Sequence, residues 1–172
     1  MKKNILLGLI FASLAFPAGA QEKKINVYAF MAEECPISIF MAASLKSVSE
    51  MYGENANFFL VFPVSSSNEK TANAFKKKHQ LQRFSVVVDS SQLLTKTLGA
   101  KVTPEVVIIN DQSVLLYKGR INDAYSQPGK RKHIFSNHDL AEALQRIVAG
   151  EPAPTAWKPA IGCIITLKKR AS

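Results

Sequence analysis

The sequence predicts a single α/β domain in which a central mixed β-sheet is flanked by helices on both faces. Short apolar runs rich in β-branched and aromatic residues alternate with segments of helical periodicity from about residue 25 onward. The last two predicted strands are joined by the short, turn-rich stretch DQS, so these two should run antiparallel. The earlier strands alternate with helices, which is typical of a parallel arrangement. Together with the antiparallel pair, they predict a mixed sheet between layers of helices.

Residues 1–20 are expected to be a secretory signal peptide. Lys2 and Lys3 form a basic start, an apolar run too short to span a bilayer comfortably follows, and AGA ends the segment as a cleavage pattern. An uncleaved anchor is the alternative, which the lack of a stop-transfer pattern disfavours. We therefore expect an exported protein, periplasmic or extracellular, with a domain over 21–150, a proline-rich tail over 151–172 and no stable membrane insertion.

The first predicted strand and helix place a cysteine at their junction. KINVYAFM (24–31) has the composition of a buried strand, and the segment 36–53 has helical spacing and ends at a glycine. Pro36 suits the first turn of a helix, where its missing N–H costs nothing. Cys35 therefore lies where the strand gives way to the helix. The apolar positions of this helix are Ile37, Phe40, Met41, Leu45, Val48 and Met51.

Two further strands enclose a second helix. Residues 56–65 form an apolar strand, and 67–80 form a helix with Ser67 or Asn68 as its N-cap. The third strand, 84–89, is short and continuously apolar.

The second half of the chain begins with a helix over 90–100 that Gly99 ends. The strands 104–110 and 114–121 form the predicted antiparallel pair.

A long polar loop over 122–137 leads to the final helix, 138–150, which ends at Gly150. Three prolines in the tail that follows favour an extended rather than a helical chain. The apolar positions of the final helix are Leu140, Ala143, Leu144, Ile147 and Val148.

The charge and the cysteine content limit the classes of partner and cofactor that we expect. The formal charge of +9 is concentrated in the runs 76–78, 129–133 and 167–170, which are typical of solvated surfaces and chain ends. An anionic partner is the less favoured alternative, and nucleic acid is not expected for an exported chain. Two cysteines in an oxidising compartment indicate a disulfide, a redox couple or a metal site. No histidine lies at a short ligand spacing from either cysteine, so we expect no metal and no bound cofactor.

The stretch YAFMAEECPIS resembles the active-site segment of thioredoxins, in which a strand ends in Phe-Trp-Ala and Cys-x-x-Cys opens a helix. Phe30, Ala32 and Cys35 match that pattern. Met31 stands in place of the tryptophan, and Ser38 replaces the second cysteine.

Two later segments extend this resemblance, which covers the chain from about residue 24 to 150. KVTPEVVII is similar to the thioredoxin-fold segment with a cis-proline facing the active site, which would make Thr103-Pro104 that bond. Gly162-Cys163 is similar to a terminal Gly-Cys of exported redoxins that resemble peroxiredoxins. The resemblance implies a thioredoxin-like fold and thiol-disulfide oxidoreductase activity on protein or small-molecule thiols and disulfides.

The position of Cys35 supports this activity on physical grounds. A thiol at the start of a helix faces unpaired N–H groups and the positive end of the helix dipole, which favour the thiolate nucleophile. Glu33 and Glu34 oppose that effect. Ser38 cannot resolve a mixed disulfide, so either the reaction stops there, as in monothiol exchange, or another thiol resolves it. Cys163 is the only candidate within the chain, and the linker before it can extend roughly 35 Å.

Two alternatives to a reversible Cys35–Cys163 couple remain open. A permanent disulfide would stabilise the fold by about 4 to 5 kcal/mol on chain-entropy grounds, so the protein could be a binding module without catalysis. Two unpaired or intermolecular thiols are the other alternative. A thiol peroxidase is less favoured, because Ala32 and Tyr28 occupy the positions of the threonine and proline that peroxiredoxins place near the reactive cysteine.

Further residues are expected to border the site. Pro36, Ser38, Thr103 and Pro104 are predicted to contact substrate, with the Thr103 backbone available for strand-like pairing. Arg120 could supply a positive charge, although an arginine after a strand is more often a surface ion-pair partner.

Trp157 is expected to anchor the tail to the body of the protein. The part of the long loop that contains Asp123, Tyr125, Lys130 and Arg131 is expected to lie near the active site.

Overall fold

The computed structural model describes residues 25–152 and 155–168. The signal peptide predicted over 1–20 lies outside this part of the chain. The elements follow in the order β1 (Ile25–Phe30), α1 (Pro36–Tyr52), β2 (Ala56–Phe62), α2 (Glu69–Lys78), β3 (Phe84–Val88), α3 (Leu93–Leu98), β4 (Val102–Thr103), β5 (Glu105–Asn110), β6 (Leu115–Gly119), β7 (Tyr125–Gln127), β8 (Lys130–Arg131), α4 (Asp139–Val148) and β9 (Cys163–Ile164).

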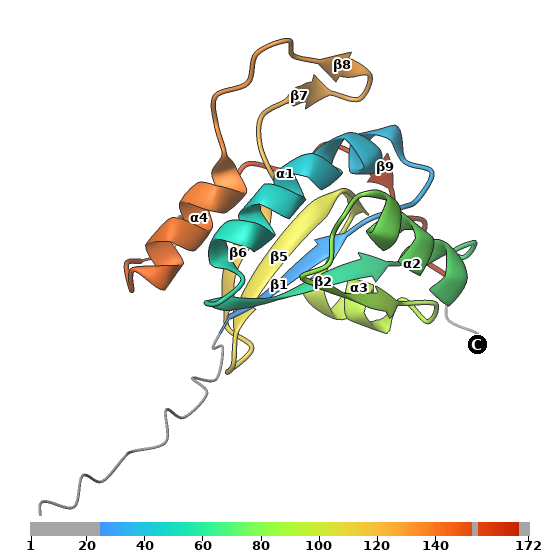
Figure 1. The fold of residues 1–172 in the computed structure, drawn as a ribbon, viewed down its shortest axis with the longest axis horizontal. Helices are drawn as coiled ribbons and strands as arrows, with labels where there is room; N and C mark the ends of the chain where they lie inside the picture. The colour runs from blue at the N-terminus through green and yellow to red at the C-terminus, as the bar shows by residue number, and fades with distance from the viewer. Residues whose placement is uncertain (1–24, 153–154, 169–172) are drawn as a thin grey trace, which may run out of the picture.

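The five longer strands form one mixed sheet in the order β3-β2-β1-β5-β6 (Figure 1). β1, β2 and β3 are parallel, whereas β5 runs antiparallel to both β1 and β6. The loop that leads to Cys35 follows the carboxyl end of β1. Since β1 is the central strand, this loop starts from the middle of the sheet. The predicted mixed sheet is confirmed.

The sheet buries apolar side chains on both faces, so the predicted two helical layers are also confirmed. Helices α1, α2 and α4 cover the larger core, which contains Leu45, Phe75 and Leu144. α3 covers the opposite face together with Ile165 of the tail. α1 and α4 lie side by side across the sheet (Figure 1).

Several element ends agree with the capping chemistry of the sequence. Asn68 caps α2 through its side chain, which accepts from the backbone N–H groups of Lys70 and Thr71. Gly99 ends α3 in the left-handed conformation, at φ 67°. Within the part of the chain that the structure describes, no helix is both long and apolar enough to cross a membrane.

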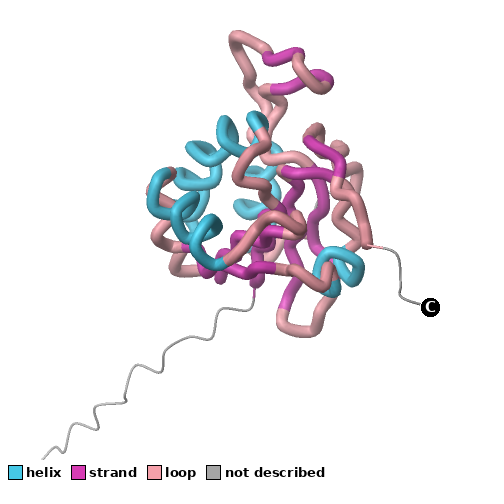
Figure 2. The backbone as a smooth tube through the Cα atoms, turned by 90° about the vertical axis from the view of Figure 1, so that its right-hand side faces the viewer, coloured by secondary structure: helices cyan, strands magenta, loops and turns pink. Residues whose placement is uncertain are grey.

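The structure also differs from the predictions in local detail. Met51, predicted on the apolar face of α1, is 66% exposed; it lies in the last turn of the helix and lines an open hollow between α1 and α4. The predicted loop 122–137 contains the hairpin β7–β8, which projects from the body of the protein in both views (Figures 1 and 2). A second small sheet joins β4 to β9 in the tail.

Candidate active site

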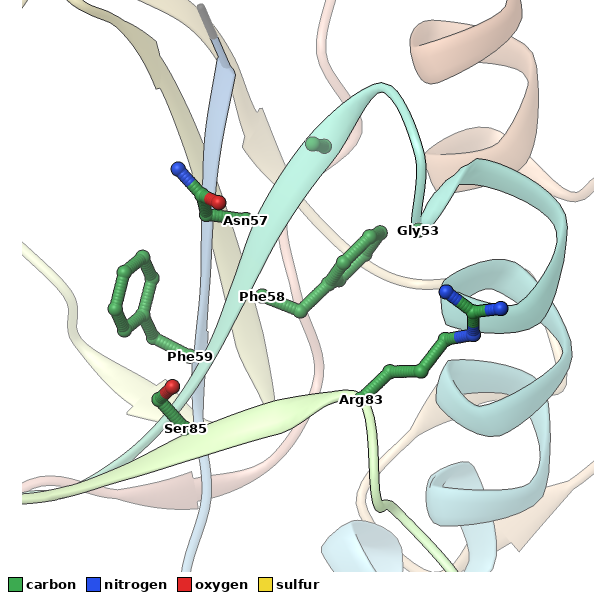
Figure 3. Close-up of a pocket in the computed structure, with 7 residues that line it drawn as sticks. Gly53, Asn57, Phe58, Phe59, Arg83 and Ser85 are labelled. Carbon is green, nitrogen blue, oxygen red and sulfur yellow. The ribbon is translucent and has the colours of Figure 1, made fainter. Parts of the chain in front are cut away.

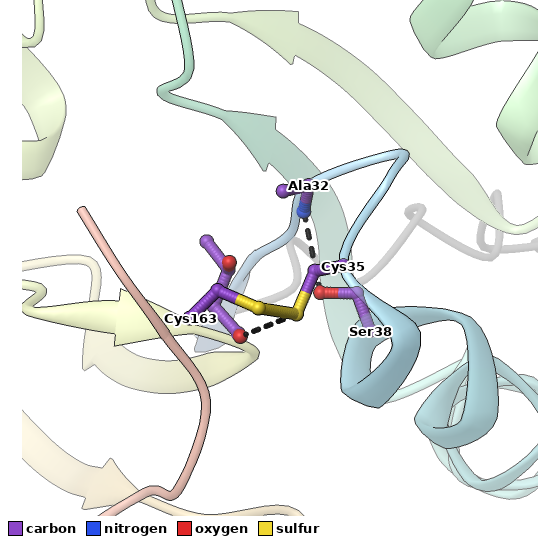
Figure 4. Close-up of a disulfide and its surroundings, with 5 residues drawn as sticks. Ala32, Cys35, Ser38 and Cys163 are labelled. Atoms are coloured by element: carbon purple, nitrogen blue, oxygen red, sulfur yellow. Dashed lines mark hydrogen bonds between the residues drawn. A yellow bond between two sulfur atoms is a disulfide. The ribbon is translucent and has the colours of Figure 1, made fainter. Parts of the chain in front are cut away.

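Cys35 and Cys163, the only cysteines of the sequence, form a disulfide (Figure 4). Their Cα atoms lie 6.3 Å apart, although the two residues are separated by 128 positions in the chain. The prediction that the tail returns Cys163 to Cys35 is therefore confirmed. Reversibility of this bond stays a prediction.

Local backbone geometry places Cys35 at the first turn of α1. Cys35 is the N-cap residue in an extended conformation, with φ −76° and ψ 116°, and Pro36 follows directly. The side chain of Cys35 makes no capping hydrogen bond, so the first N–H groups of α1 remain available to a negatively charged sulfur. Glu33 directs its carboxylate elsewhere, since it accepts hydrogen bonds from Ser67 Oγ at 2.6 Å and Thr71 Oγ1 at 2.7 Å.

The tail delivers Cys163 by pairing with the segment before Pro104. β9 lies antiparallel to β4, with Cys163 opposite Thr103 and Ile164 opposite Val102. The Thr103-Pro104 peptide bond is cis, as predicted. The sulfur of Cys35 lies 3.1 Å from the Thr103 carbonyl oxygen. A disulfide carries no proton, so this is a contact, which becomes a hydrogen bond only if Cys35 is reduced to a thiol.

Gly162 allows this close approach. A Cβ atom at residue 162 would collide with the carbonyl group of Thr103 and approach the nitrogen of Pro104. The glycine before Cys163 therefore has a steric reason, and the backbone of Thr103 is covered by the tail.

Contacts on both sides of Cys163 hold the tail in place. Upstream, the Lys158 carbonyl accepts the Arg120 N–H at 3.2 Å, and Trp157 packs against Tyr117 with ring centroids 6.3 Å apart. The anchoring contact expected of Trp157 is thus present. Because Gly119 has no side chain, the Lys158 carbonyl can approach its backbone closely.

Downstream of Cys163, Ile165 is buried and Gln92 binds the tail backbone. Gln92 Nε2 donates to the Thr166 carbonyl at 3.0 Å and to the Pro63 carbonyl at 2.9 Å, while Gln92 Oε1 accepts the Lys168 N–H at 2.7 Å. Only 2% of Gln92 is exposed. Gln92 was not among the predicted site residues, since an amide side chain before a short helix gives no signal of this role.

The other residues that were predicted to contact substrate differ in their exposure. Pro36 is exposed. Ser38 is fully buried, and its hydroxyl accepts the Ala32 N–H at 3.3 Å, so it supports the loop before Cys35. Thr103 and Pro104 are buried. Their contact with a substrate stays a prediction.

Arg120 is committed to an ion pair. Its Nε and Nη2 atoms donate to the Asp139 carboxylate at 2.8 and 3.1 Å. Arg120 also lines a cavity of only about 10 Å³ with Pro104 and Ile161. The contacts of Arg120 are those of the alternative, an ion-pair partner. Its electrostatic role toward a substrate stays a prediction.

The β7–β8 hairpin packs its base against α1 close to Cys35. Phe40 contacts Tyr125 edge to face at 5.6 Å, and the Arg131 guanidinium lies 4.9 Å from the centre of the Phe40 ring. Tyr125 also lines the small cavity beside Pro104. The loop therefore borders the disulfide region, while Lys130 is exposed farther out on the hairpin.

Asp123 holds the ends of this loop together. It is buried, and its carboxylate accepts hydrogen bonds from Lys132 Nζ at 2.6 Å and from the backbone N–H groups of Ser136 and Asn137. These bonds, led by that of Lys132, hold the pKa of Asp123 well below its usual range.

Other hollows lie away from the disulfide. Figure 3 shows one of about 290 Å³ where β2 and β3 begin, with Asn57, Phe59, Arg83 and Ser85 among its walls. Since β1 and β2 are parallel, this hollow and Cys35 lie at opposite ends of the sheet. Within the described ranges, no group of three or more His, Cys, Asp or Glu side chains could hold a metal ion.

Comparison with known proteins places the fold but not a named family. No protein-family model matches the chain. No curated protein matches it either.

Solved structures are similar to this chain. A hypothetical protein of Sinorhizobium meliloti has a TM-score of 0.74 at 22% identity, over 87% of this chain and 82% of that protein. A thioredoxin-like protein in its oxidised form has a TM-score of 0.56 at 16% identity, over 75% of this chain and 80% of its own. A secreted Mycobacterium tuberculosis disulfide oxidoreductase has a TM-score of 0.52 at 16% identity, over 74% and 82%. The chain has a thioredoxin-like fold.

Proposed function

We propose that this protein is a thiol-disulfide oxidoreductase of the redoxin type that uses Cys35 and Cys163 as a reversible couple. The observation that carries the proposal is the disulfide itself, which joins the first turn of a helix to a tail strand beside a cis-proline. The fold supports the proposal, because structurally similar proteins include a disulfide oxidoreductase.

The chemistry needs no bound cofactor. Two partner thiols reduce the Cys35–Cys163 disulfide and become a disulfide themselves, so two electrons and two protons pass to the protein. Cys35 is the nucleophile of the couple, since the N–H groups of α1 favour its thiolate. Ser38 contributes no sulfur, so Cys163 supplies the second thiol.

We further propose that the protein acts outside the cytoplasm, in the periplasm or beyond the cell. The pattern of residues 1–20 supports export, and a structurally similar protein is secreted. An oxidising compartment suits a disulfide in the resting protein. The partners are protein or small-molecule thiols and disulfides, and not nucleic acid.

A binding module without catalysis is the second candidate. The anchoring of the tail on both sides of Cys163 favours it, because Lys158, Ile165 and Gln92 would hold a permanent structural bond equally well. A thiol peroxidase has less support, since Arg120 is paired with Asp139 and Ala32 lacks a hydroxyl that could hold peroxide.

A redox titration distinguishes the two leading candidates. The purified protein is equilibrated in glutathione buffers of graded potential, and the fraction of oxidised protein is read by thiol alkylation and mass spectrometry. A midpoint well above about −300 mV is expected for a working couple, whereas a value near or below it would favour the structural bond. Reduction of insulin disulfides by the wild type but not by Cys35→Ser is the matching activity readout.

A further inference from the structure

We propose that a partner thiol attacks the disulfide at Cys163 and expels Cys35, so that the tail carries the covalent intermediate. This inference rests on the proposed function, because it assigns roles within the same couple. The two cysteines differ in the burial of the residue, in the direction from which a nucleophile can approach the sulfur and in the quality of the sulfur as a leaving group.

Burial favours Cys163 as the point of attack. Only 4% of Cys35 is exposed, whereas Cys163 is exposed and its neighbour Ile164 is 83% exposed. β9, which consists of these two residues, has β4 as its one partner strand in the described part of the chain. The other edge of β9 is therefore unpaired.

The direction of attack favours Cys163 as well. A thiolate approaches a disulfide sulfur from the side opposite the bond that breaks. For Cys35, that side holds the first turn of α1, where Figure 4 shows Ser38 beyond the Cys35 sulfur. Ser38 is fully buried and bonded to the Ala32 N–H, so a partner could reach this side only by opening the turn. Cys163 lies at the exposed end of the bond.

Leaving-group quality points to the same outcome. Thiolates of lower pKa leave faster, and a sulfur facing the first N–H groups of a helix is stabilised as thiolate. Cys35 is the N-cap residue of α1 and so lies at the positive end of the helix dipole, while Cys163 lies in a two-residue strand. The Thr103 carbonyl oxygen, 3.1 Å from the Cys35 sulfur, opposes this effect, because it accepts a hydrogen bond from the Cys35 thiol and not from the thiolate.

The proposed step balances as a disulfide exchange. The partner thiolate forms a bond to the Cys163 sulfur, the Cys35–Cys163 bond breaks, and its electron pair leaves with Cys35 as thiolate. A second partner thiolate then attacks the partner's sulfur and releases Cys163. The partner pair is oxidised to a disulfide, and the two protein cysteines are reduced and take up the two protons. In the reverse direction, the Cys163 thiolate first attacks the partner disulfide and expels one partner thiolate. Cys35 is then the nucleophile that attacks the mixed disulfide on Cys163, so its thiolate forms the bond within the protein.

The anchored tail keeps Cys163 close to Cys35 during the exchange. The contacts of Lys158 before Cys163 and of Ile165 after it do not involve the disulfide, so we expect the tail to stay bound when the bond opens. A mixed disulfide on Cys163 then remains within reach of Cys35, and this proximity shortens its lifetime.

Mapping of the first adduct tests the proposal. Oxidised protein is mixed with excess reduced glutathione, quenched in acid within seconds, alkylated and analysed by peptide mass spectrometry. We expect glutathione on Cys163 and the alkyl group on Cys35, with at least about tenfold excess over the opposite pattern. Glutathione found mainly on Cys35 overturns the inference and leaves the proposed function intact. A disulfide that stays oxidised at every glutathione concentration overturns both.

Single-cysteine variants provide a matched second measurement. In Cys163→Ser the tail still covers Cys35, and in Cys35→Ser the Cys163 thiol stays on the exposed strand. Cys163 is expected to react with Ellman's reagent at least about ten times faster than Cys35. Equal rates, or a faster Cys35, would contradict the assignment. Circular dichroism establishes that both variants are folded.

Discussion

Gly162 determines how closely the tail can approach the start of α1. Its missing side chain leaves room for the Thr103 carbonyl and the Pro104 nitrogen. Without this approach, the Cys163 sulfur could not meet Cys35 in the observed pairing of β9 with β4. The residue before the cysteine is thus as important to the geometry of the bond as the cysteine itself.

Gly162→Ala should therefore weaken the disulfide without disturbing the main sheet. The added methyl group meets backbone, which cannot rotate away, so we expect a cost of about 1 to 3 kcal/mol. The equilibrium constant for bond formation against glutathione should fall by about 5- to 150-fold. Thr166→Ala is the matched control, because the exposed Thr166 offers Gln92 only its backbone carbonyl. An unchanged constant in Gly162→Ala would refute the steric argument.

Among individual residues, those that belong to a local sequence motif could be predicted. Cys35, Pro104 and Cys163 were predicted because each belongs to a recognisable local pattern. Gln92 was not, because its function depends on tail residues more than seventy positions away. Ser38 was predicted to contact substrate, but the sequence does not show that it is buried. Its burial results from the way the loop before α1 folds back, so that the Ala32 N–H donates to its hydroxyl.

A single charged group, Asp123, holds together the ends of the loop that contains the β7–β8 hairpin. Asp123 joins Lys132, beyond the hairpin, to the backbone of Ser136 and Asn137. Because these bonds lower the pKa of Asp123, its carboxylate stabilises the folded state fully only above the pKa of the unfolded chain, about 3.9.

Asp123→Asn should therefore remove part of the pH dependence of stability. We expect the wild type to exceed the variant by about 1 to 3 kcal/mol in free energy of unfolding at pH 7. The difference should shrink as the pH falls below about 4, since the Asp123 carboxylate of the unfolded chain is then progressively protonated while that of the folded protein stays ionised. Urea titrations at pH 7, 4 and 2.5 measure it. A difference that stays constant over this range would exclude the ionic contribution.

The longer elements were predictable, and the shortest were not. Strands such as 56–65 and the helix 36–53 carry enough apolar residues for their period to be recognised. β4 and β9 have two residues each, and their pairing depends on the path of the tail. The hairpin β7–β8 lies in a polar segment without alternating apolar residues, so its sequence resembled a loop.

On the scale of the whole molecule, the disulfide joins the start of the first helix to the last described strand. A closed loop of this length restricts the unfolded chain strongly, whether or not the bond is also redox-active. The docked tail adds burial of Ile165 to the face that α3 covers.

The double variant Cys35→Ser/Cys163→Ser should accordingly be less stable than the oxidised protein by about 4 to 5 kcal/mol on chain-entropy grounds. Chemical denaturation of both proteins measures the difference, and the reduced wild type serves as the control that retains both sulfur atoms. A loss below about 1 kcal/mol would show that the bond hardly constrains the unfolded state.

The contact between Trp157 and Tyr117 has a practical consequence. Trp157 is the only tryptophan of the sequence, and it lies in the very segment that brings the second sulfur to the first. Its intrinsic fluorescence therefore reports whether that segment is seated, with no attached dye. Stopped-flow emission can follow undocking in real time and separate it from cleavage of the sulfur–sulfur bond.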